Sequence, residues 1–459
     1  MKVKLLSENI IFISSLFIFC ILLIVKKDFW DGDAIEYAIN IQNLDGLKYW
    51  FFSSGWHLQY YFILIENFVS SITGIHFKFI DDLINFFSIY IIFKESNILV
   101  KNLFPEFLNN RIILFNIILF LSPIWSLLLS SVLSFHFFCL ALFLYSIRKF
   151  NNTNNNLYLL LVFLSFGLKS LLFFSPFYNY FVFGRNYKIS LKILLLAIFY
   201  FLINMLLIPN SGEFLDENYN DLTLNIYSIL TNFFRFFSLI FPVLILFFKK
   251  FREGISSKSI EVSILLFLIA ITPYILVGKS SFLLSFHHWE LRQSLLIIFI
   301  IPLIYSLIIY KNKLFIIVFF MVYPLFTFYG YAIKINNNIY ENDLLIELKK
   351  NELVSDYSLV NLSSDFSTRL KFNPSEINNL FIEDYPNTFF YNTDKELKDY
   401  YKNFKNEKIK NWKIYPKIKS DSVLILNITS SGYRNATEIF LNILRMNSNK
   451  KINIEVIEN

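Results

Sequence analysis

The residues best suited to chemistry in this chain of 459 residues lie in the stretch Trp30-Asp31-Gly32-Asp33-Ala34-Ile35-Glu36-Tyr37. A carboxylate such as Asp33 can accept the proton of an attacking hydroxyl group. Tyr37 follows four residues later, so both side chains share one face if a helix begins at Asp33. A structural role is the alternative, because Asp31 or Asp33 can cap a helix by accepting hydrogen bonds from free backbone N–H groups. The sequence leaves both roles open.

A second group of polar residues, His287, His288 and Glu290, raises the question of a metal site. Adjacent histidines point in different directions on a helix, and only one further ligand lies nearby, whereas zinc takes three or four. We therefore predict no metal here and expect these residues to contact substrate or to lie at a membrane interface. His57 stands alone, and either a substrate contact or a hydrogen bond within its own segment suits it.

A further candidate, Arg235, falls inside an apolar segment. A charge within the membrane is by default a functional hypothesis. The alternative is that its long side chain reaches outward to the membrane surface.

The elements that must position these residues are membrane helices. Of the residues, 55% are hydrophobic and 17% are charged, whereas about 25% are charged in soluble domains. A bilayer-spanning helix needs about 20 mainly apolar residues. Candidate segments recur at 10–25, 58–75, 79–98, 111–130, 132–147, 157–183, 189–208, 226–248, 260–278, 293–310 and 313–333. Segment 157–183 contains Gly167, Lys169 and Pro176, which favours two short helices that meet near Lys169.

The charges of the loops predict the topology. Fifteen of the 24 Lys and Arg residues before residue 334 fall in loop clusters. All these clusters lie on the same side of the membrane if segment 58–75 does not cross it. Cytoplasmic loops carry such an excess of Lys and Arg. The polar residues of segment 58–75 suit a helix that lies at the membrane interface. We therefore predict an all-α, multi-pass protein with about 11 transmembrane helices, a cytoplasmic N-terminus and outer loops at 26–78, 209–225 and 279–292.

The chain changes character after residue 333. Residues 334–459 are polar and contain a strand-like run at 422–428 and a helical pattern at 436–446. We predict a transmembrane domain over 1–333 and a small extracytoplasmic α/β domain over 334–459. Cys20 and Cys139 lie within apolar segments and form neither a metal-binding spacing nor a disulfide framework. The basic residues sort by membrane side and form no nucleic-acid motif, which excludes nucleic acid as a partner.

The first outer loop resembles that of GT-C glycosyltransferases, membrane enzymes that use polyprenyl-phosphate sugars; the protein O-mannosyltransferases and the lipid A aminoarabinose transferase are examples. Members often carry an Asp-Glu-x-x-Tyr motif and then a His-Pro-Pro-Leu-Tyr-Tyr-like stretch. The counterparts here are Asp33-Ala34-Ile35-Glu36-Tyr37 and His57-Leu58-Gln59-Tyr60-Tyr61. Ala34 replaces the usual second acidic residue, and the prolines after His57 are absent.

Later segments are similar to the same family in the same order. They are Leu121-Ser122-Pro123, Phe166-Gly167-Leu168-Lys169 and Trp289-Glu290-Leu291-Arg292. Many members place another acidic residue near the position of Ser134-Phe135-His136, where this chain has none. That departure weakens a metal-assisted mechanism, and the sequence identifies no cofactor.

The resemblance implies transfer of a sugar from a polyprenyl-phosphate donor to a lipid or glycan acceptor on the outer face of the plasma membrane. Asp33 would be the general base. Arg292 would bind the leaving phosphate because a guanidinium can bond two of its oxygens, with Lys169 and Arg235 as alternatives. Glu36, Tyr37, His57, His287, His288 and Glu290 complete the predicted substrate-binding set.

Three other functions remain open. A transporter or lipid-carrier flippase would have matched inverted halves and buried charges, and of these only Arg235 is recognisable. A polysaccharide polymerase or ligase would have a long loop between late spans. A catalytically silent relative would keep the architecture and bind a partner through its tail.

Overall fold

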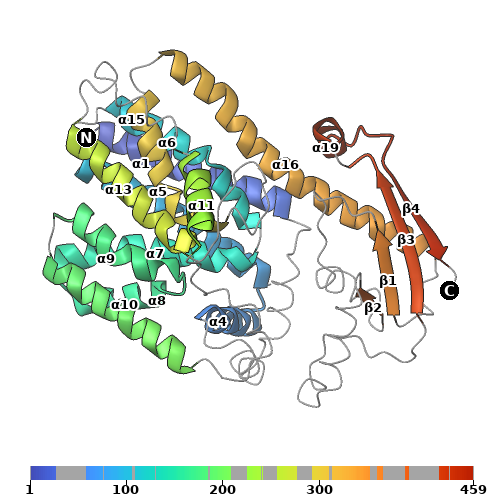
Figure 1. Ribbon diagram of the computed structural model, residues 1–459, viewed down its shortest axis with the longest axis horizontal. Helices are drawn as coiled ribbons and strands as arrows, with labels where there is room; N and C mark the ends of the chain where they lie inside the picture. The colour runs from blue at the N-terminus through green and yellow to red at the C-terminus, as the bar shows by residue number, and fades with distance from the viewer. Residues whose placement is uncertain are drawn as a thin grey trace. The chain divides into compact units, whose positions relative to one another are not determined.

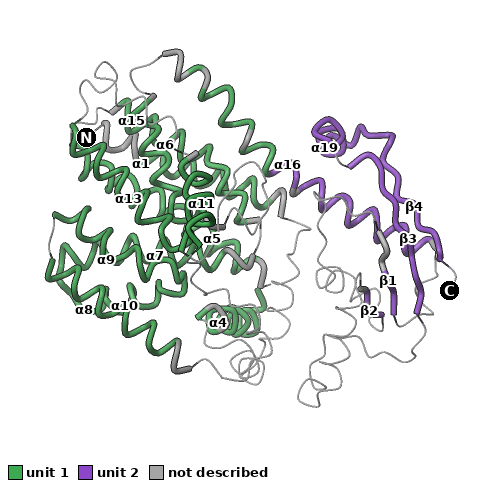
Figure 2. Tube along the Cα trace, viewed as in Figure 1, with its two compact units in different colours: residues 1–24, 47–330 green, residues 25–46, 331–459 purple. Residues whose placement is uncertain are grey.

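A computed structural model of the chain divides into two compact units, residues 1–24 with 47–330 (unit 1) and residues 25–46 with 331–459 (unit 2) (Figure 2). The structure describes residues 2–26, 58–75, 77–105, 109–129, 131–184, 187–207, 225–238, 240, 256–276, 292–309, 313–351, 359–364, 388–391, 423–433 and 435–457.

Every described secondary-structure element of unit 1 is a helix (Figure 1). Its helices are α1 (Lys2–Lys26), α4 (Leu58–Thr73), α5 (Phe77–Leu103), α6 (Asn109–Phe120), η1 (Pro123–Leu129), α7 (Ser131–Thr153), α8 (Asn156–Ser165), α9 (Ser170–Val182), α10 (Tyr187–Leu207), α11 (Ile226–Ser238), α13 (Ser257–Leu276), η4 (Arg292–Ile297), α15 (Ile300–Ile309) and the first half of α16 (Lys313–Asn351). The predicted helix over 58–75 is therefore present as α4.

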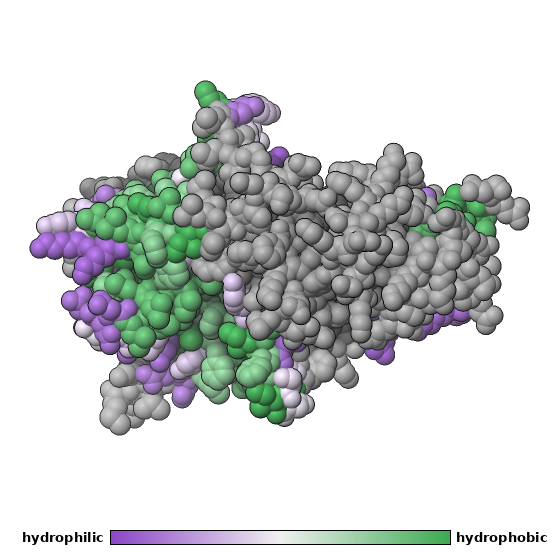
Figure 3. Space-filling view, turned by 90° about the horizontal axis from the view of Figure 1, so that it is seen from below, coloured by the Kyte–Doolittle hydropathy of each residue, from purple (hydrophilic) through white to green (hydrophobic). Residues whose placement is uncertain are grey.

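Four described helical segments are long and apolar enough to cross a membrane: Phe79–Leu103, Asn110–Leu128, Tyr187–Asn204 and Ser257–Leu276. The surface of α10 is particularly apolar, and Leu195 on it is 57% exposed. Figure 3 shows apolar residues gathered on the described surface of this unit. Soluble proteins rarely leave so large a contiguous apolar surface open to water. The described part of the chain thus has the composition of a membrane protein, while the predicted number of about 11 spans stays a prediction.

Helices α5 and α7 run parallel. Ser134 of α7 donates a hydrogen bond to Asp81 of α5, and Arg148 of α7 pairs with Glu95 of α5. The two contacts lie fourteen residues apart on each helix, about 21 Å along the axis. The intervening segment, α6 with η1, must therefore return the chain from one end of the pair to the other. We call the end with Asp81 and Ser134 the acidic end, and the end with Glu95 and Arg148 the basic end.

Other helices attach to the basic end through amide side chains. One network joins α5 to α6, and the other joins α7, α9 and α10; the residues are Asn97 with Asn116, and Asn151 with Asn179 and Ser190. These two networks hold together helix ends that carry basic residues. The loop charges predict that these residues share one side of the membrane: Lys94, Lys101, Arg111, Arg148, Lys149 and Lys188. The charge asymmetry seen in the sequence therefore corresponds to one physical end of unit 1.

The predicted break near Lys169 is confirmed. Helices α8 and α9 meet at a turn over residues 166–169, and Asn155 starts α8 by accepting a hydrogen bond from the backbone N–H of Leu157 at 2.9 Å. Gly167 allows the turn to pack on α7, because a Cβ there would lie 2.6 Å from the Phe135 ring. With ten and thirteen residues, each helix is shorter than a membrane crossing requires.

In unit 2 the sheet order is β2 (Phe389–Tyr391), β1 (Leu359–Ser364), β3 (Val423–Ser431), β4 (Lys451–Ile457). Strand β1 pairs parallel with β2 and β3, whereas β4 is antiparallel to β3. Helix α19 (Ala436–Ile443) follows β3. The predicted α/β character of the C-terminal region, including its strand-like run and its helix, is confirmed.

The predicted boundary at residue 333 is not a helix end, because α16 continues to Asn351. Its later turns place Tyr340, Leu344 and Leu348 four residues apart, so these side chains form one stripe. The stripe is buried against Val360 and Leu426 of the sheet. This packing extends the helix into the polar region, since tertiary burial stabilises helices more than intrinsic propensity does.

Candidate functional site

The acidic end of unit 1 contains a pair of buried carboxylates on α5. Asp81 is 3% exposed and Asp82 is 5% exposed. Ser134 donates to Oδ2 of Asp81 at 3.3 Å, and Asn85 donates to the same oxygen at 3.4 Å. Burying a carboxylate is costly unless hydrogen bonds compensate it, so two adjacent ones in an apolar bundle favour a functional origin. Such a pair can accept a proton or bind a cationic group.

Helix α4 brings a third carboxylate to unit 1. Its Phe62 packs against the rings of Phe135 and Phe138 on α7, with both centroid distances 5.2 Å. Glu66 follows Phe62 by four residues, on the same face of α4, and is buried. Glu66 and Phe62 therefore both lie on the face of α4 that packs toward the interior of unit 1.

The predicted phosphate-binding residue Lys169 lies at the same end, in the turn between α8 and α9. Its side chain is exposed. The turn is held on one side by the contact of Gly167 with Phe135, the neighbour of Ser134. On the other side, the Tyr274 hydroxyl donates to Oγ of Ser170 at 2.9 Å. Lys169 thus sits on a backbone fixed by α7 and α13.

Arg235 is exposed in the last turn of α11. The next residue, Phe236, is buried and packs against Tyr274, with 6.3 Å between ring centroids. Tyr274 therefore links the backbone that carries Arg235 to the backbone that carries Lys169. Of the predicted site residues, these two are brought to neighbouring elements.

The other predicted site residues are less fully placed. Arg292 is the first residue of η4, and nothing is described of its side chain. The remaining predicted residues lie outside the described part of the chain: Asp33, Glu36, Tyr37, His57, His287, His288 and Glu290. Among the residues that the structure describes, no group of three or more His, Cys, Asp or Glu side chains could hold a metal ion.

Asp81, Asp82 and Glu66 were missed as site candidates by the sequence reasoning, although a usable signal was present. All three stand inside or beside apolar segments, where an ionisable residue marks a functional hypothesis. The resemblance also drew attention to an acidic residue missing near Ser134, and Asp81 supplies a carboxylate to Ser134 from a different helix.

The basic end has its own buried charges. Arg148 makes two hydrogen bonds to Glu95, from Nε at 2.5 Å and from Nη2 at 2.8 Å. A small pocket beside the pair is lined in part by Asn102 and Tyr178 and has space for about one water molecule. Because the ion pair satisfies both charges, we assign it a structural role that ties α5 to α7.

Comparison of the chain with protein-family models, with characterised proteins and with solved structures finds no match.

Proposed function

We propose that the chain is a multi-pass membrane glycosyltransferase with GT-C-like architecture. It transfers a sugar from a polyprenyl-phosphate donor to a lipid or glycan acceptor at the outer face of the plasma membrane. The N-terminus and the basic end face the cytoplasm, and the acidic end and residues 334–459 face outward. The sequence resemblance of the loops supports the reaction, and the two differently charged ends of unit 1 support the orientation.

The observation that carries the proposal is the buried pair Asp81–Asp82 at the same end of unit 1 as Lys169. Glycosyl transfer from a lipid phosphate needs a carboxylate to take a proton and a cation to stabilise the leaving phosphate. The acidic end has groups of both types. Asp33 on the first outer loop is the proposed general base, and Asp81 supports the acceptor site.

In the proposed reaction, an acceptor hydroxyl oxygen attacks the anomeric carbon of the sugar. Its proton passes to the carboxylate of Asp33 as the new bond forms. The bond between the anomeric carbon and the phosphate oxygen breaks, and the lipid phosphate leaves with the bonding electrons. Arg292, with Lys169 or Arg235, stabilises this negative charge. Direct displacement inverts the configuration at the anomeric carbon.

The test is sugar transfer in membranes that contain the full chain, with radiolabelled undecaprenyl-phosphate hexose and pentose donors. Asp33→Asn and Asp81→Asn should each reduce transfer by about 10²-fold or more, the size of a lost general acid–base or polar contribution. Glu261→Gln, an exposed carboxylate on α13, is the matched control and should transfer normally. Unchanged transfer by Asp33→Asn refutes its assignment as base, and absence of transfer by the unmodified chain with every donor refutes the reaction.

One observation favours a second candidate, a lipid-carrier flippase. Transporters bind anionic groups at discontinuous helices within the membrane, and α8 and α9 form such an interrupted pair around Lys169. A flippase would move a fluorescent polyprenyl-phosphate across a proteoliposome bilayer without releasing labelled sugar. The same preparation can be used for both assays, so their outcomes separate the two functions.

A further inference from the structure

Helix α19 of unit 2 and the turn that follows it expose an apolar surface that no described contact covers. Phe440 is 61% exposed, Leu444 is 47% exposed and Met446 is 69% exposed; we call these three residues the α19 patch. The opposite face of the helix is buried through Ile439 and Asn442. A capping box between Asn435 and Glu438 closes the N-terminus of α19. The helix is therefore capped at its N-terminus and packed on one face, with Phe440 outward and Leu444 and Met446 exposed just after its last residue.

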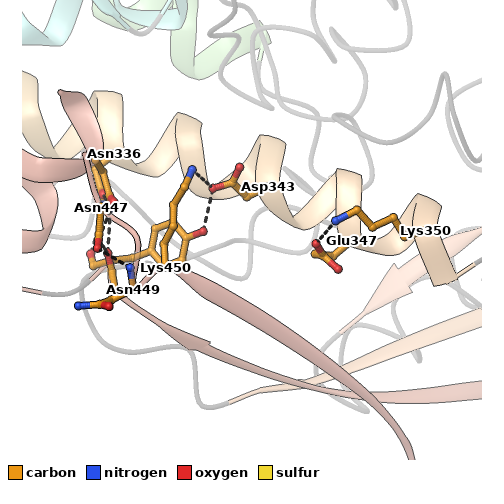
Figure 4. Close-up of polar contacts among 10 residues, drawn as sticks. Asn336, Asp343, Glu347, Lys350, Asn447, Asn449 and Lys450 are labelled. Atoms are coloured by element: carbon orange, nitrogen blue, oxygen red, sulfur yellow. Dashed lines mark hydrogen bonds and ion pairs between the residues drawn. The ribbon is translucent and has the colours of Figure 1, made fainter. Parts of the chain in front are cut away.

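The position of α19 is fixed by amide hydrogen bonds. Asn442 donates to Oδ1 of Asn336 on α16 at 2.7 Å and to the carbonyl of Gly432 at 2.9 Å. Asn447 donates to the same carbonyl at 2.8 Å, and Figure 4 shows Asn336 and Asn447 close together. Asn336, Asn442 and Asn447 are buried. This network holds α19 at the level of Asn336 along α16.

That level is where α16 changes from apolar to polar. Residues 313–333 are mainly apolar, and Asn336-Asn337-Asn338 is the first polar run after them. Asn336 lies three residues past Ile333, about 5 Å along the helix axis. The headgroup layer on each side of the hydrocarbon core is about 5–8 Å thick. If the apolar half of α16 is in the bilayer, α19 therefore lies at the depth of the headgroups.

The basic residue within the patch suits a lipid surface. Arg445 is exposed and stands between Leu444 and Met446. Helices that lie on membranes combine apolar side chains at the acyl boundary with basic residues near lipid phosphates. Basic residues beside a membrane also gain from anionic headgroups.

We propose that the α19 patch is a membrane anchor: Phe440, Leu444 and Met446 insert at the headgroup–acyl boundary of the leaflet where the apolar half of α16 ends. The anchor gives unit 2 an attachment to the membrane in addition to α16. This inference rests on the proposed membrane residence of α16 and is independent of the proposed sugar transfer.

The test places a spin label on single cysteines of the full chain in nanodiscs of phosphatidylcholine and phosphatidylglycerol. Cys20→Ser removes the exposed native thiol, and Cys139 is buried. Labels at Phe440→Cys and Met446→Cys are compared with Glu455→Cys, an exposed site on β4, and with Leu195→Cys on α10. Power saturation with oxygen reports lipid exposure, and saturation with a water-soluble nickel chelate reports water exposure.

We expect positions 440 and 446 to favour oxygen, as position 195 does, while position 455 favours the nickel chelate. Two cysteines in the patch keep the test valid if one variant fails to fold. The anchor is refuted if 440 and 446 favour the nickel chelate or are shielded from both reagents while 195 favours oxygen. If 195 also favours the nickel chelate, the membrane residence itself is wrong.

Discussion

Gly167→Ala probes the packing that positions the Lys169 turn. The added Cβ would lie 2.6 Å and 2.8 Å from two atoms of the Phe135 ring and 3.1 Å from Sγ of Cys139. Those ring atoms must move by about 1 Å to restore ordinary contact. The ring cannot move freely, because it is buried and packs on Phe62 at 5.2 Å. Overpacking of this kind costs about 1–3 kcal/mol.

A double-mutant cycle isolates this contact. Phe135→Leu shortens the side chain and by itself costs about 1–2 kcal/mol through the cavity that it leaves. In the double variant the new methyl group fills part of that space, so the combined cost should fall below the sum of the single costs by about 1–2 kcal/mol. The assay is reversible unfolding by sodium dodecyl sulfate in mixed micelles, followed by circular dichroism. Strictly additive costs would refute the close approach of the turn to α7.

Two further predictions concern charged contacts elsewhere. Glu95→Gln leaves Arg148 partly buried without its carboxylate partner, so the free energy of unfolding in mixed micelles should fall by about 3–5 kcal/mol. The control Glu261→Gln, at an exposed position, should change it by about 0.5 kcal/mol or less. Equal effects of the two substitutions would rule out a stabilising ion pair. In unit 2, the Tyr433 hydroxyl donates to Asp343 at 2.8 Å, and burial together with this carboxylate raises the pKa of Tyr433 above its ordinary value of 10.0. The folded state therefore holds the phenolic proton more tightly than the unfolded state does. The Tyr433 hydroxyl thus makes its full contribution to the free energy of unfolding below pH 10, and this contribution is lost as the pH rises further. Tyr433→Phe should lower the free energy of unfolding by about 1–2 kcal/mol at neutral pH and abolish the loss of stability above pH 10. Hydrogen exchange of the β3 amides in the full chain measures both effects. If the variant still loses stability above pH 10 as the parent does, Tyr433 is not the source of that loss.

Local features of this fold follow from local sequence. The apolar segments predict where helices lie, as α4, α10 and α13 show. The break at Lys169 was predictable because Gly167 has a low helix propensity and Lys169 interrupts the apolar run, whereas α9 continues through Pro176. In the C-terminal region, the short apolar run at β3 and the helical pattern at α19 were recognisable from local sequence, because run length and periodicity distinguish strand from helix.

Tertiary features could not be read in this way. The contact between Asp81 and Ser134 joins residues 53 positions apart, and no local sequence pattern predicts it. The extension of α16 past residue 333 depends on a sheet formed by strands up to a hundred residues later. Residues 334–351 are polar on average, so composition predicts a domain boundary at residue 333. Packing against the sheet instead continues the helix through that position. Asp33, His57 and the 287–290 group stay predictions from motif resemblance.

The central claim is that the acidic and basic ends of unit 1 open on opposite faces of a membrane. Its most direct test is labelling by a membrane-impermeant maleimide of full-length Cys20→Ser chains in intact cells. Thr73→Cys is exposed where α4 leads into α5 near Asp81, and Asn152→Cys is exposed in the last turn of α7 near Arg148. We predict that position 73 is labelled in intact cells and that position 152 is labelled only after permeabilisation. Labelling of both positions in intact cells, or of position 152 alone, would contradict the claim.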